Sequence, residues 1–338
     1  MGKELNILFT CVGRRVSLVR EFRRAMELLG VAGKLYGTDV AVSAPALQVV
    51  DEGIIVHRVR SVQYIPTLLD IVREKKIGLV VPLTDLDLRC LSRQQGKFVA
   101  LGCTVMISPE KAVKICRNKQ MFNKHLVSAT LPSIRTFGLA EFRKEPFYPC
   151  FVKPLHGSGG VGSAVIKSGR ELRSHIYAFG DQLMVQDFVP GQEYTVDVYR
   201  RRDGQIECVV PRQRLAVRSG EVDVGITVLD EELIASTKKL AESIDGLWGV
   251  FCCQCRRPAG QRPYFFEINP RFGGGSPLSI AAGAFLPLYL LQEVLGLPIN
   301  PDKNQFKPNM LMMRYAGEFY QQIEDPSILP GFKNPIFK

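Results

Sequence analysis

The sequence predicts an α/β protein that begins with a parallel, Rossmann-like sheet and continues into antiparallel strands. Strand and helix patterns alternate over about the first 110 residues, which is typical of a parallel sheet with helices on its faces. A glycine-rich segment follows a strand that ends at Lys153, and a late strand at 264–269 carries acidic and amide side chains on one face. These features together favour a ligand site built on strand ends.

Composition places the chain among ordinary globular proteins of two or three domains. Of its 338 residues, 46% are hydrophobic and 23% are charged. Its apolar runs stop well short of the roughly 20 residues of a membrane helix, and the N-terminus enters a strand rather than a signal peptide. We therefore expect a cytoplasmic protein with no membrane partner.

Nine cysteines, an odd number without framework spacing, predict reduced thiols. The cluster Cys252, Cys253 and Cys255 lacks the second half of a zinc site, so small buried side chains are the simplest interpretation, and any further role stays open.

A formal net charge of +11 raises the question of a nucleic-acid partner. The basic residues form short, scattered pairs such as Arg14-Arg15 and Lys75-Lys76, without an aromatic-interleaved binding motif. This distribution argues against nucleic acid, and a polyanionic small ligand explains the charge as well.

The N-terminal elements have the order of a Rossmann-like unit. The expected strands are 5–12, 34–38, 52–59 and 77–82, with helices at 14–29 and 65–75. The first turn has the single glycine Gly13 where a dinucleotide fingerprint needs three, which excludes the usual NAD site.

Polar residues follow the ends of these strands, where open α/β sheets keep their ligand crevice. Thr84 and Asp85 follow the strand 77–82, and Gly13 and Arg14 follow the first strand. They are candidates for substrate binding. Helix capping by Thr84 or Asp85 is the alternative, and both stay open.

A helix is expected from a cap at Ser108, through Lys119, to about His125. The strand that ends at Lys153 then leads into a segment whose backbone N–H groups can surround phosphate oxygens. Its candidate residues are Gly157, Ser158, Gly159, Gly160 and Gly162. It is not a Walker loop, because the lysine precedes the glycines, and a hairpin tip is the alternative.

A strand and linker at 183–189 are followed by a strand in which Glu193 and Asp197 share one face. Backbone groups of such a linker suit an adenine ring, and a nearby carboxylate suits ribose hydroxyls. Strands at 205–211 and 222–228 and a helix at 230–244 continue the chain.

The last motif is a hairpin of strands 249–255 and 264–269, which places Gln254 on the same side as Glu267 and Asn269. Such hard oxygen donors are ligands that Mg²⁺ prefers. Arg271 follows, then Gly273 to Gly275, which let backbone approach a ligand closely. A buried strand with a polar end is the alternative.

The order of Phe-Val-Lys153-Pro, the glycine segment, Gly-Gln-Glu193-Tyr-Thr-Val-Asp197 and Glu267-Ile-Asn269-Pro-Arg271 resembles the ATP-grasp superfamily. Within it, the carbamoyl phosphate synthetase large chain is the most similar. The resemblance covers roughly residues 5–300. It implies an ATP-grasp fold with a Rossmann-like pre-ATP-grasp domain at 1–110, an α+β lid at 111–185 and a C-terminal antiparallel α+β subdomain at 186–338.

The resemblance also implies a role for each matching residue. Lys119, Lys153 and the glycine segment would bind ATP phosphates, Gln186, Asp187, Phe188 and Val189 the adenine, and Glu193 the ribose. Gln254, Glu267 and Asn269 would hold Mg²⁺, or Mn²⁺ in its place, and Arg271 would stabilise the transferred phosphoryl group. Gln254 departs from the acidic residue of many relatives, and Asn118 stands where an aspartate is common.

The motifs occur once each, whereas the resembling large chain carries two such units. A single unit favours an ATP-dependent ligase that joins a small carboxylate to an amine through an acyl phosphate, with ADP and phosphate as products. An anionic substrate would be bound near Arg212, Arg214, Arg218 and Arg271. Considered individually, however, Arg212 and Arg218 are each expected to be exposed on the surface. The alternatives are phosphorylation of bicarbonate or carbamate, and a non-catalytic ATP- or nucleic-acid-binding protein. A homodimer is the default expectation.

Overall fold

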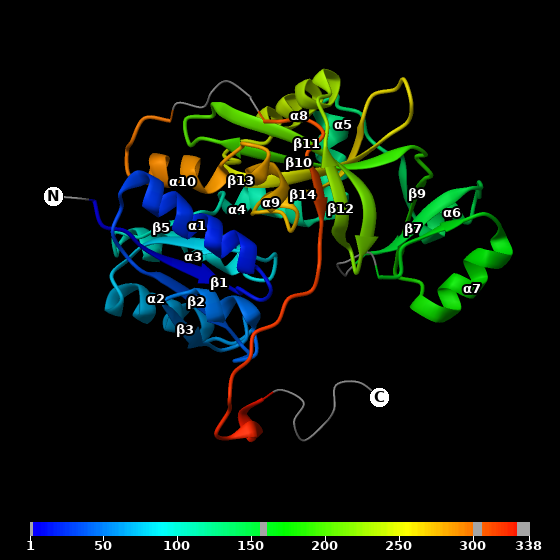
Figure 1. Ribbon diagram of the computed structural model, residues 1–338. Coiled ribbons are helices and arrows are strands. Elements are labelled where there is room, and N and C mark those ends of the chain that lie inside the picture. The colour runs from blue at the N-terminus through cyan, green and yellow to red at the C-terminus, as the bar shows by residue number, and fades with distance from the viewer. Residues whose placement is uncertain (1–2, 156–160, 300–305, 330–338) are drawn as a thin grey trace.

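The computed structural model of the chain describes residues 3–155, 161–299 and 306–329 (Figure 1). It contains three sheets in chain order: a parallel sheet, a small antiparallel sheet, and a large antiparallel sheet that takes most of the C-terminal half. The predicted α/β class is therefore confirmed.

The parallel sheet has the strand order β3-β2-β1-β4-β5. Its elements are β1 (Asn6–Thr10), α1 (Val16–Leu29), β2 (Leu35–Asp39), β3 (Glu52–Ile55), α2 (Tyr64–Glu74), β4 (Ile77–Pro82), α3 (Leu88–Val99) and β5 (Thr104–Val105). The strand predicted at 52–59 ends earlier, at Ile55. The chain adds β2 and β3 on one side of β1, and β4 and β5 on the other. The topological switch point, where such sheets bind ligands, therefore lies between β1 and β4.

Alternate residues of β1 enter different cores, as the period of a strand requires. Ile7 and Phe9 join the cluster under α1, whereas Leu8 joins a second cluster with α2 and α3. The first cluster continues without a break into the large sheet, with the Phe22 ring 5.4 Å from the Phe272 ring between centroids. The parallel sheet and the large sheet thus share one core.

The small sheet has the order β6-β9-β7-β8, with its own hydrophobic cluster around Phe142 and Val152. Its elements are β6 (Thr136–Gly138), α6 (Leu139–Phe142), β7 (Cys150–Pro154), β8 (Ala164–Ile166), α7 (Gly169–Phe179) and β9 (Leu183–Asp187). It projects to one side of the molecule in Figure 1. We call it the lid.

The large sheet has the order β14-β13-β10-β11-β12-β15. Its strands are β10 (Gln192–Arg200), β11 (Ile206–Arg218), β12 (Glu221–Thr227), β13 (Gly249–Arg257), β14 (Tyr264–Asn269) and β15 (Leu311–Met313). The helices of this half are α8 (Glu231–Ser243), α9 (Ser276–Ala281) and α10 (Leu286–Val294). Helices α9 and α10 contact α1, which joins this half to the parallel sheet.

The single helix expected from Ser108 to about His125 is wrong. Two helices replace it, α4 (Glu110–Arg117) and α5 (Lys119–Ser128), with Asn118 in an extended conformation between them. The Asn118 side chain accepts hydrogen bonds from the backbone N–H groups of Gln120 and Met121, so it caps α5. Ser108 makes no cap; its hydroxyl contacts the backbone of Trp248 instead.

Helices α4 and α5 also contact β14 of the large sheet, although the predicted lid begins at residue 111. We retain the boundaries at 110 and 185 as a proposal.

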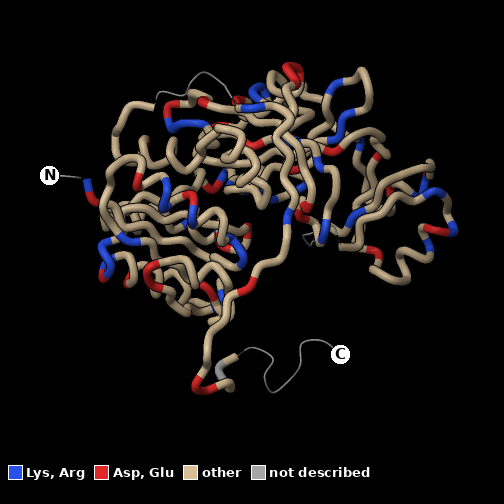
Figure 2. Tube along the Cα trace, viewed as in Figure 1, with Lys and Arg blue, Asp and Glu red and all other residues tan. Residues whose placement is uncertain are grey.

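Charged residues are spread over all three sheets, with Lys and Arg interleaved with Asp and Glu along the trace (Figure 2). Within the described ranges, no helix has the length and apolar character that crossing a bilayer requires.

Candidate functional site

A cavity of about 1070 Å³ lies where the three sheets meet. The parallel sheet contributes the segment after β4, the lid contributes β7 and β9, and the large sheet contributes β13, β14 and the β11–β12 turn. Most residues predicted as site residues line it, namely Thr84, Asp85, Lys119, Lys153, Gln186, Asp187, Phe188, Val189, Glu193, Arg214, Gln254, Glu267, Asn269 and Arg271. Residues far apart in sequence, from Arg15 to Arg271, therefore line one cavity.

The remaining predicted residues are placed differently. Gly157, Ser158, Gly159 and Gly160 lie outside the described residues. Gly162 is described but is not among the lining residues; its φ of +69° and its approach to Pro154 and Phe179 explain the glycine there. Gly13 donates its N–H to Asp39, and neither Gly13 nor Arg14 lines the cavity. Arg15 lines it instead, which sequence reasoning missed.

The hairpin of β13 and β14 brings three oxygen donors to the cavity. Its register places Gln254 opposite Glu267, and Cys252 opposite Asn269. Residues two apart on a strand share a face, so Gln254, Glu267 and Asn269 lie together, as predicted. The Oδ1 atom of Asn269 is buried and has no hydrogen-bond partner within the described part of the chain. A buried acceptor without a donor is costly, and a cation such as Mg²⁺ would satisfy it.

Two lysines lie beside these donors. Lys119 is the first residue of α5, where the Asn118 cap fixes the helix end. Lys153 ends the run of buried residues in β7, is 6% exposed, and holds its ammonium 5.9 Å from the centroid of the Phe266 ring. Burial, then repulsion from Lys119, lowers the pKa of Lys153 to about 8, and attraction to Glu267 opposes the shift. An anion bound beside Lys153 would offset both the burial and the repulsion from Lys119, and would therefore stabilise the charged ammonium.

We expect the affinity for ATP to fall as pH rises through 8. The charged ammonium of Lys153 is the form that binds phosphate; it predominates below its pKa and is about one-tenth populated one unit above it. Between pH 7 and pH 9 the association constant should drop severalfold, and binding near pH 8 should take up protons. Calorimetry in buffers of different ionisation enthalpy measures both, and Lys153→Met should remove the proton uptake. Equal uptake in that variant would contradict this assignment.

The predicted adenine and ribose residues lie at the lid end of the cavity. Gln186 donates from its side-chain amide to the Thr136 hydroxyl at 2.9 Å, and Asp187 forms a two-pronged pair with Arg135. Glu193 is already paired with Arg214 at 3.3 Å and Arg256 at 3.2 Å. Arg214, predicted to bind substrate, is thus directed at Glu193 and at the Gly220 carbonyl.

Arg271 connects the large sheet to the parallel sheet. Its guanidinium donates to Asp85 and to the Phe272 carbonyl, and only 12% of its side chain is exposed. Burial opposes its charge and is the largest single effect, but attraction to Asp85, Cys252 and Glu267 and the hydrogen bond to Asp85 together raise the pKa of Arg271. Asp85 also pairs with Arg117 at 3.3 Å. Thr84 accepts from the backbone N–H of Leu86 at 3.3 Å, but neither Thr84 nor Asp85 caps a helix, because the N-cap of α3 is Asp87 and no side chain caps that helix.

The expectation that Arg212 is exposed is wrong. It is 1% exposed and forms a two-pronged pair with buried Asp197 at 2.8 and 2.9 Å, and Ser279 donates to the same carboxylate. The glycine triplet makes room for this pair: a Cβ on Gly275 would lie 2.1 Å from Arg212 Nη1. Arg218 is 79% exposed, as expected.

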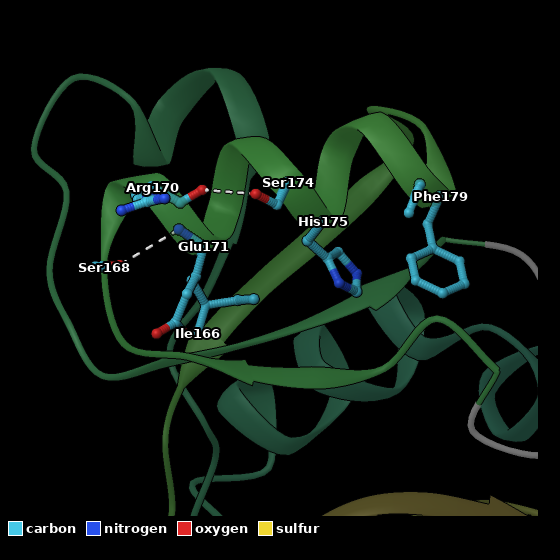
Figure 3. Close-up of a pocket in the computed structure, with 8 residues that line it drawn as sticks. Ile166, Ser168, Arg170, Glu171, Ser174, His175 and Phe179 are labelled. Atoms are coloured by element: carbon cyan, nitrogen blue, oxygen red, sulfur yellow. Dashed lines mark hydrogen bonds between the residues drawn. The ribbon is translucent and has the colours of Figure 1, made fainter.

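A second hollow, of about 590 Å³, lies on the lid along α7 (Figure 3). His175 and Phe179 lie side by side there, and His175 Nε2 is 3.0 Å from the Gly162 carbonyl. None of the predicted site residues lines this hollow. The cavity between the sheets is therefore the candidate site.

Two family models match the chain. Residues 7–106 match the model described as the PylC-like N-terminal domain, and residues 180–317 match the model described as ATP-grasp in the biosynthetic pathway with Ter operon. The ATP-grasp unit that the motifs predicted is thus confirmed over residues 180–317. The ATP-grasp match contains the donors of β13 and β14 together with Glu193 and Arg271, so the family motif and the cavity coincide.

The ATP-grasp relatives include the D-alanine–D-alanine ligase of Corynebacterium aurimucosum, 26% identical over 44% of this chain and 48% of the relative. The arginine-specific carbamoyl phosphate synthase large chain of Neurospora crassa is 22% identical over 81% of this chain and 25% of the relative. The chain thus spans about half of the first and a quarter of the second.

Solved ATP-grasp structures share the fold. An ADP complex of N5-carboxyaminoimidazole ribonucleotide synthetase matches with a TM-score of 0.71 at 20% identity, over 91% of this chain and 80% of that one. Biotin carboxylase of Campylobacter jejuni matches with a TM-score of 0.69 at 18% identity, over 90% of this chain and 74% of that one. The predicted ATP-grasp fold with a Rossmann-like N-terminal domain is confirmed.

Proposed function

We propose that the protein is an ATP- and Mg²⁺-dependent ligase that joins a carboxylate to an amine through an acyl phosphate. One observation carries the proposal: Lys119, Lys153 and the donors of the β13–β14 hairpin line the same cavity as Arg271. Transfer of a phosphoryl group needs cations around charge that is spread over oxygens, and little other chemistry from the protein.

In this proposal the two lysines bind the phosphates of ATP. Lys153 is buried with its ammonium over the Phe266 ring, and the Asn118 cap fixes the backbone from which Lys119 extends, so the positions of both residues are set before ATP binds. The backbone from Gln186 to Val189 contacts the adenine. Two of the similar solved structures are complexes with ADP, which supports a nucleotide in this fold.

Gln254, Glu267 and Asn269 hold Mg²⁺, and Mn²⁺ can replace it. The unpartnered Asn269 oxygen and the carboxylate opposite Gln254 fit a hard cation that keeps some of its water. When bound, the ion neutralises phosphate charge. The described residues contain no group of three His, Cys, Asp or Glu side chains that could hold a metal, so the two amides are essential to this site.

Arg271 orients the reacting groups. Asp85 and the Phe272 carbonyl fix its guanidinium, which leaves its remaining face for the transferred phosphoryl group. An oxygen of the substrate carboxylate bonds to the γ-phosphorus as the bond to ADP breaks. The amine nitrogen then bonds to the acyl carbon as the bond from that carbon to the phosphate oxygen breaks, and the released phosphate takes up the proton that the amine loses.

Lys153→Ala and Glu267→Ala should each lower amine-dependent ADP release about a hundredfold, because each removes a charge that stabilises the transferred group. ADP release across a panel of acids and amines measures this. Lys167→Ala, on the exposed surface of the lid, and Glu242→Ala, on the exposed face of α8, are the matched controls. A purified protein that binds no ATP in the presence of Mg²⁺ would refute the proposal.

Phosphorylation of bicarbonate is the second candidate, because Gln254 matches the carbamoyl phosphate synthetase pattern and a large chain of that enzyme is among the relatives. ADP release that depends on bicarbonate and on no organic acid would favour it. Intact ATP after long incubation, together with steeply salt-dependent binding to random DNA or RNA, would instead favour a non-catalytic binding protein.

A further inference from the structure

The side of the cavity formed with the parallel sheet carries more positive than negative charge. Asp85 is shared by Arg271 and Arg117, and Glu221 is shared by Arg15 at 2.9 Å and Arg314 at 2.9 Å. We call Arg15, Arg117, Arg271 and Arg314 the arginine cluster. In these four ion pairs, four guanidinium groups share the two carboxylates of Asp85 and Glu221, so the pairs carry two more positive than negative charges.

Burial makes this excess costly. Arg15 and Arg271 are 17% and 12% exposed, far less than the surface residue Arg218 at 79%. Burial, together with repulsion from Arg271 and Arg314, lowers the pKa of Arg15 despite its pairing with Glu221. A buried charge is costly unless a group of opposite charge lies beside it. An anion would therefore complement the arginine cluster.

The phosphate side of the cavity does not supply this anion. Lys119 and Lys153 lie beside Glu267, whereas Arg15 comes from the turn after β1, at the switch point of the parallel sheet. Arg15 reaches the glycine triplet that follows Arg271, since a Cβ on Gly274 would be 2.6 Å from Arg15 Nη1, and the two guanidinium groups repel each other. A second anionic group near Arg15 would therefore lie next to a carboxylate at Arg271.

We propose that the acid substrate carries two anionic groups, a carboxylate that is activated beside Arg271 and a second group that Arg15 binds. This inference rests on the proposed function and specifies its substrate class. The second group is a carboxylate or a phosphate monoester, since both accept two hydrogen bonds from a guanidinium. Arg314 holds Glu221 in place, and Glu221 limits the net charge that the anion meets.

The test uses the full chain with saturating Mg²⁺ and the β,γ-imido analogue of ATP, which occupies the lysines. Succinate, 2-phosphoglycolate and butyrate are titrated by calorimetry; 2-phosphoglycolate carries a carboxylate and a phosphate monoester, and butyrate has the chain length of succinate but one charge. Arg15→Gln should weaken binding of the preferred one of the first two acids about tenfold or more, the effect of one lost charged hydrogen bond. Glu221→Gln should tighten the same binding severalfold. Arg20→Gln, on the exposed face of α1, is the matched control and should change nothing.

The opposite signs of the two variants separate charge recognition from misfolding, because a damaged fold would weaken binding in both. Tighter binding of succinate than of 2-phosphoglycolate identifies a dicarboxylic acid, and the reverse identifies a phosphorylated acid. Binding of both acids no tighter than that of butyrate, or two variants that shift affinity in the same direction, would overturn the inference while nucleotide binding persists. If the ATP analogue does not bind, the proposed function fails, and the same titrations without nucleotide still decide whether Arg15 and Glu221 select anions.

Discussion

Arg212→Met is expected to lower the free energy of unfolding by about 3–5 kcal/mol, since it leaves the fully buried carboxylate of Asp197 without its cation. Ser279 alone would remain as a side-chain donor to that carboxylate. The midpoint of urea unfolding, at unchanged slope, measures the loss.

Arg218→Met is the matched control, because Arg218 lies on the same strand and also pairs with an aspartate, Asp223, but on the surface. It should change stability by no more than about 1 kcal/mol. Adding Asp197→Asn to Arg212→Met should recover part of the loss, since no unpaired charge then stays buried. Equal destabilisation by Arg212→Met and Arg218→Met would show that burial of the pair is unimportant.

Arg271→Gln is expected to lower kcat for ADP release about a thousandfold, with a smaller effect on the binding of ATP with Mg²⁺. In the proposed function its guanidinium meets the phosphoryl group during transfer, so its contribution arises in the transition state. Steady-state kinetics and nucleotide calorimetry on the same preparation separate the two effects. Arg271→Lys should restore little, because an ammonium lacks the planar fork.

Arg117→Gln is the matched control, since Arg117 pairs with the same Asp85. If Arg271 acted only by holding Asp85, the two variants would lose kcat to a similar extent. A loss confined to Arg271→Gln, with melting temperatures alike, supports contact with the reacting groups.

Local pattern was enough to predict the parts of the site that lie on regular strands. The hairpin of β13 and β14 follows from its strand lengths and turn, and strand periodicity then puts Gln254 beside Glu267. Lys153 was predicted because it ends a strand directly before the glycine segment. In each case, the signal lies within about twenty residues.

Pairings between side chains on different elements left no such signal. Arg212 looked exposed because arginine usually is, and spacing alone does not show that its side chain meets Asp197 on the neighbouring strand. The apolar run of residues 208–211 directly before Arg212 was a hint of burial in the sequence. Asn118 was missed as a cap because the apolar spacing of α4 continues across it into α5. Arg15 rather than Arg14 lines the cavity because of the backbone turn at Gly13, where φ is +46°.

The contact of Arg314 with Glu221 and with the Gly274 carbonyl also affects the order in which the chain gains function during synthesis. The parallel sheet pairs segments that are close in sequence, so it can form while the rest of the chain is still being made. The contacts of Arg314 with Glu221 and Gly274, by contrast, cannot form until the ribosome has released the chain beyond β15. If Arg15 binds the substrate as proposed, the site is therefore completed late in synthesis.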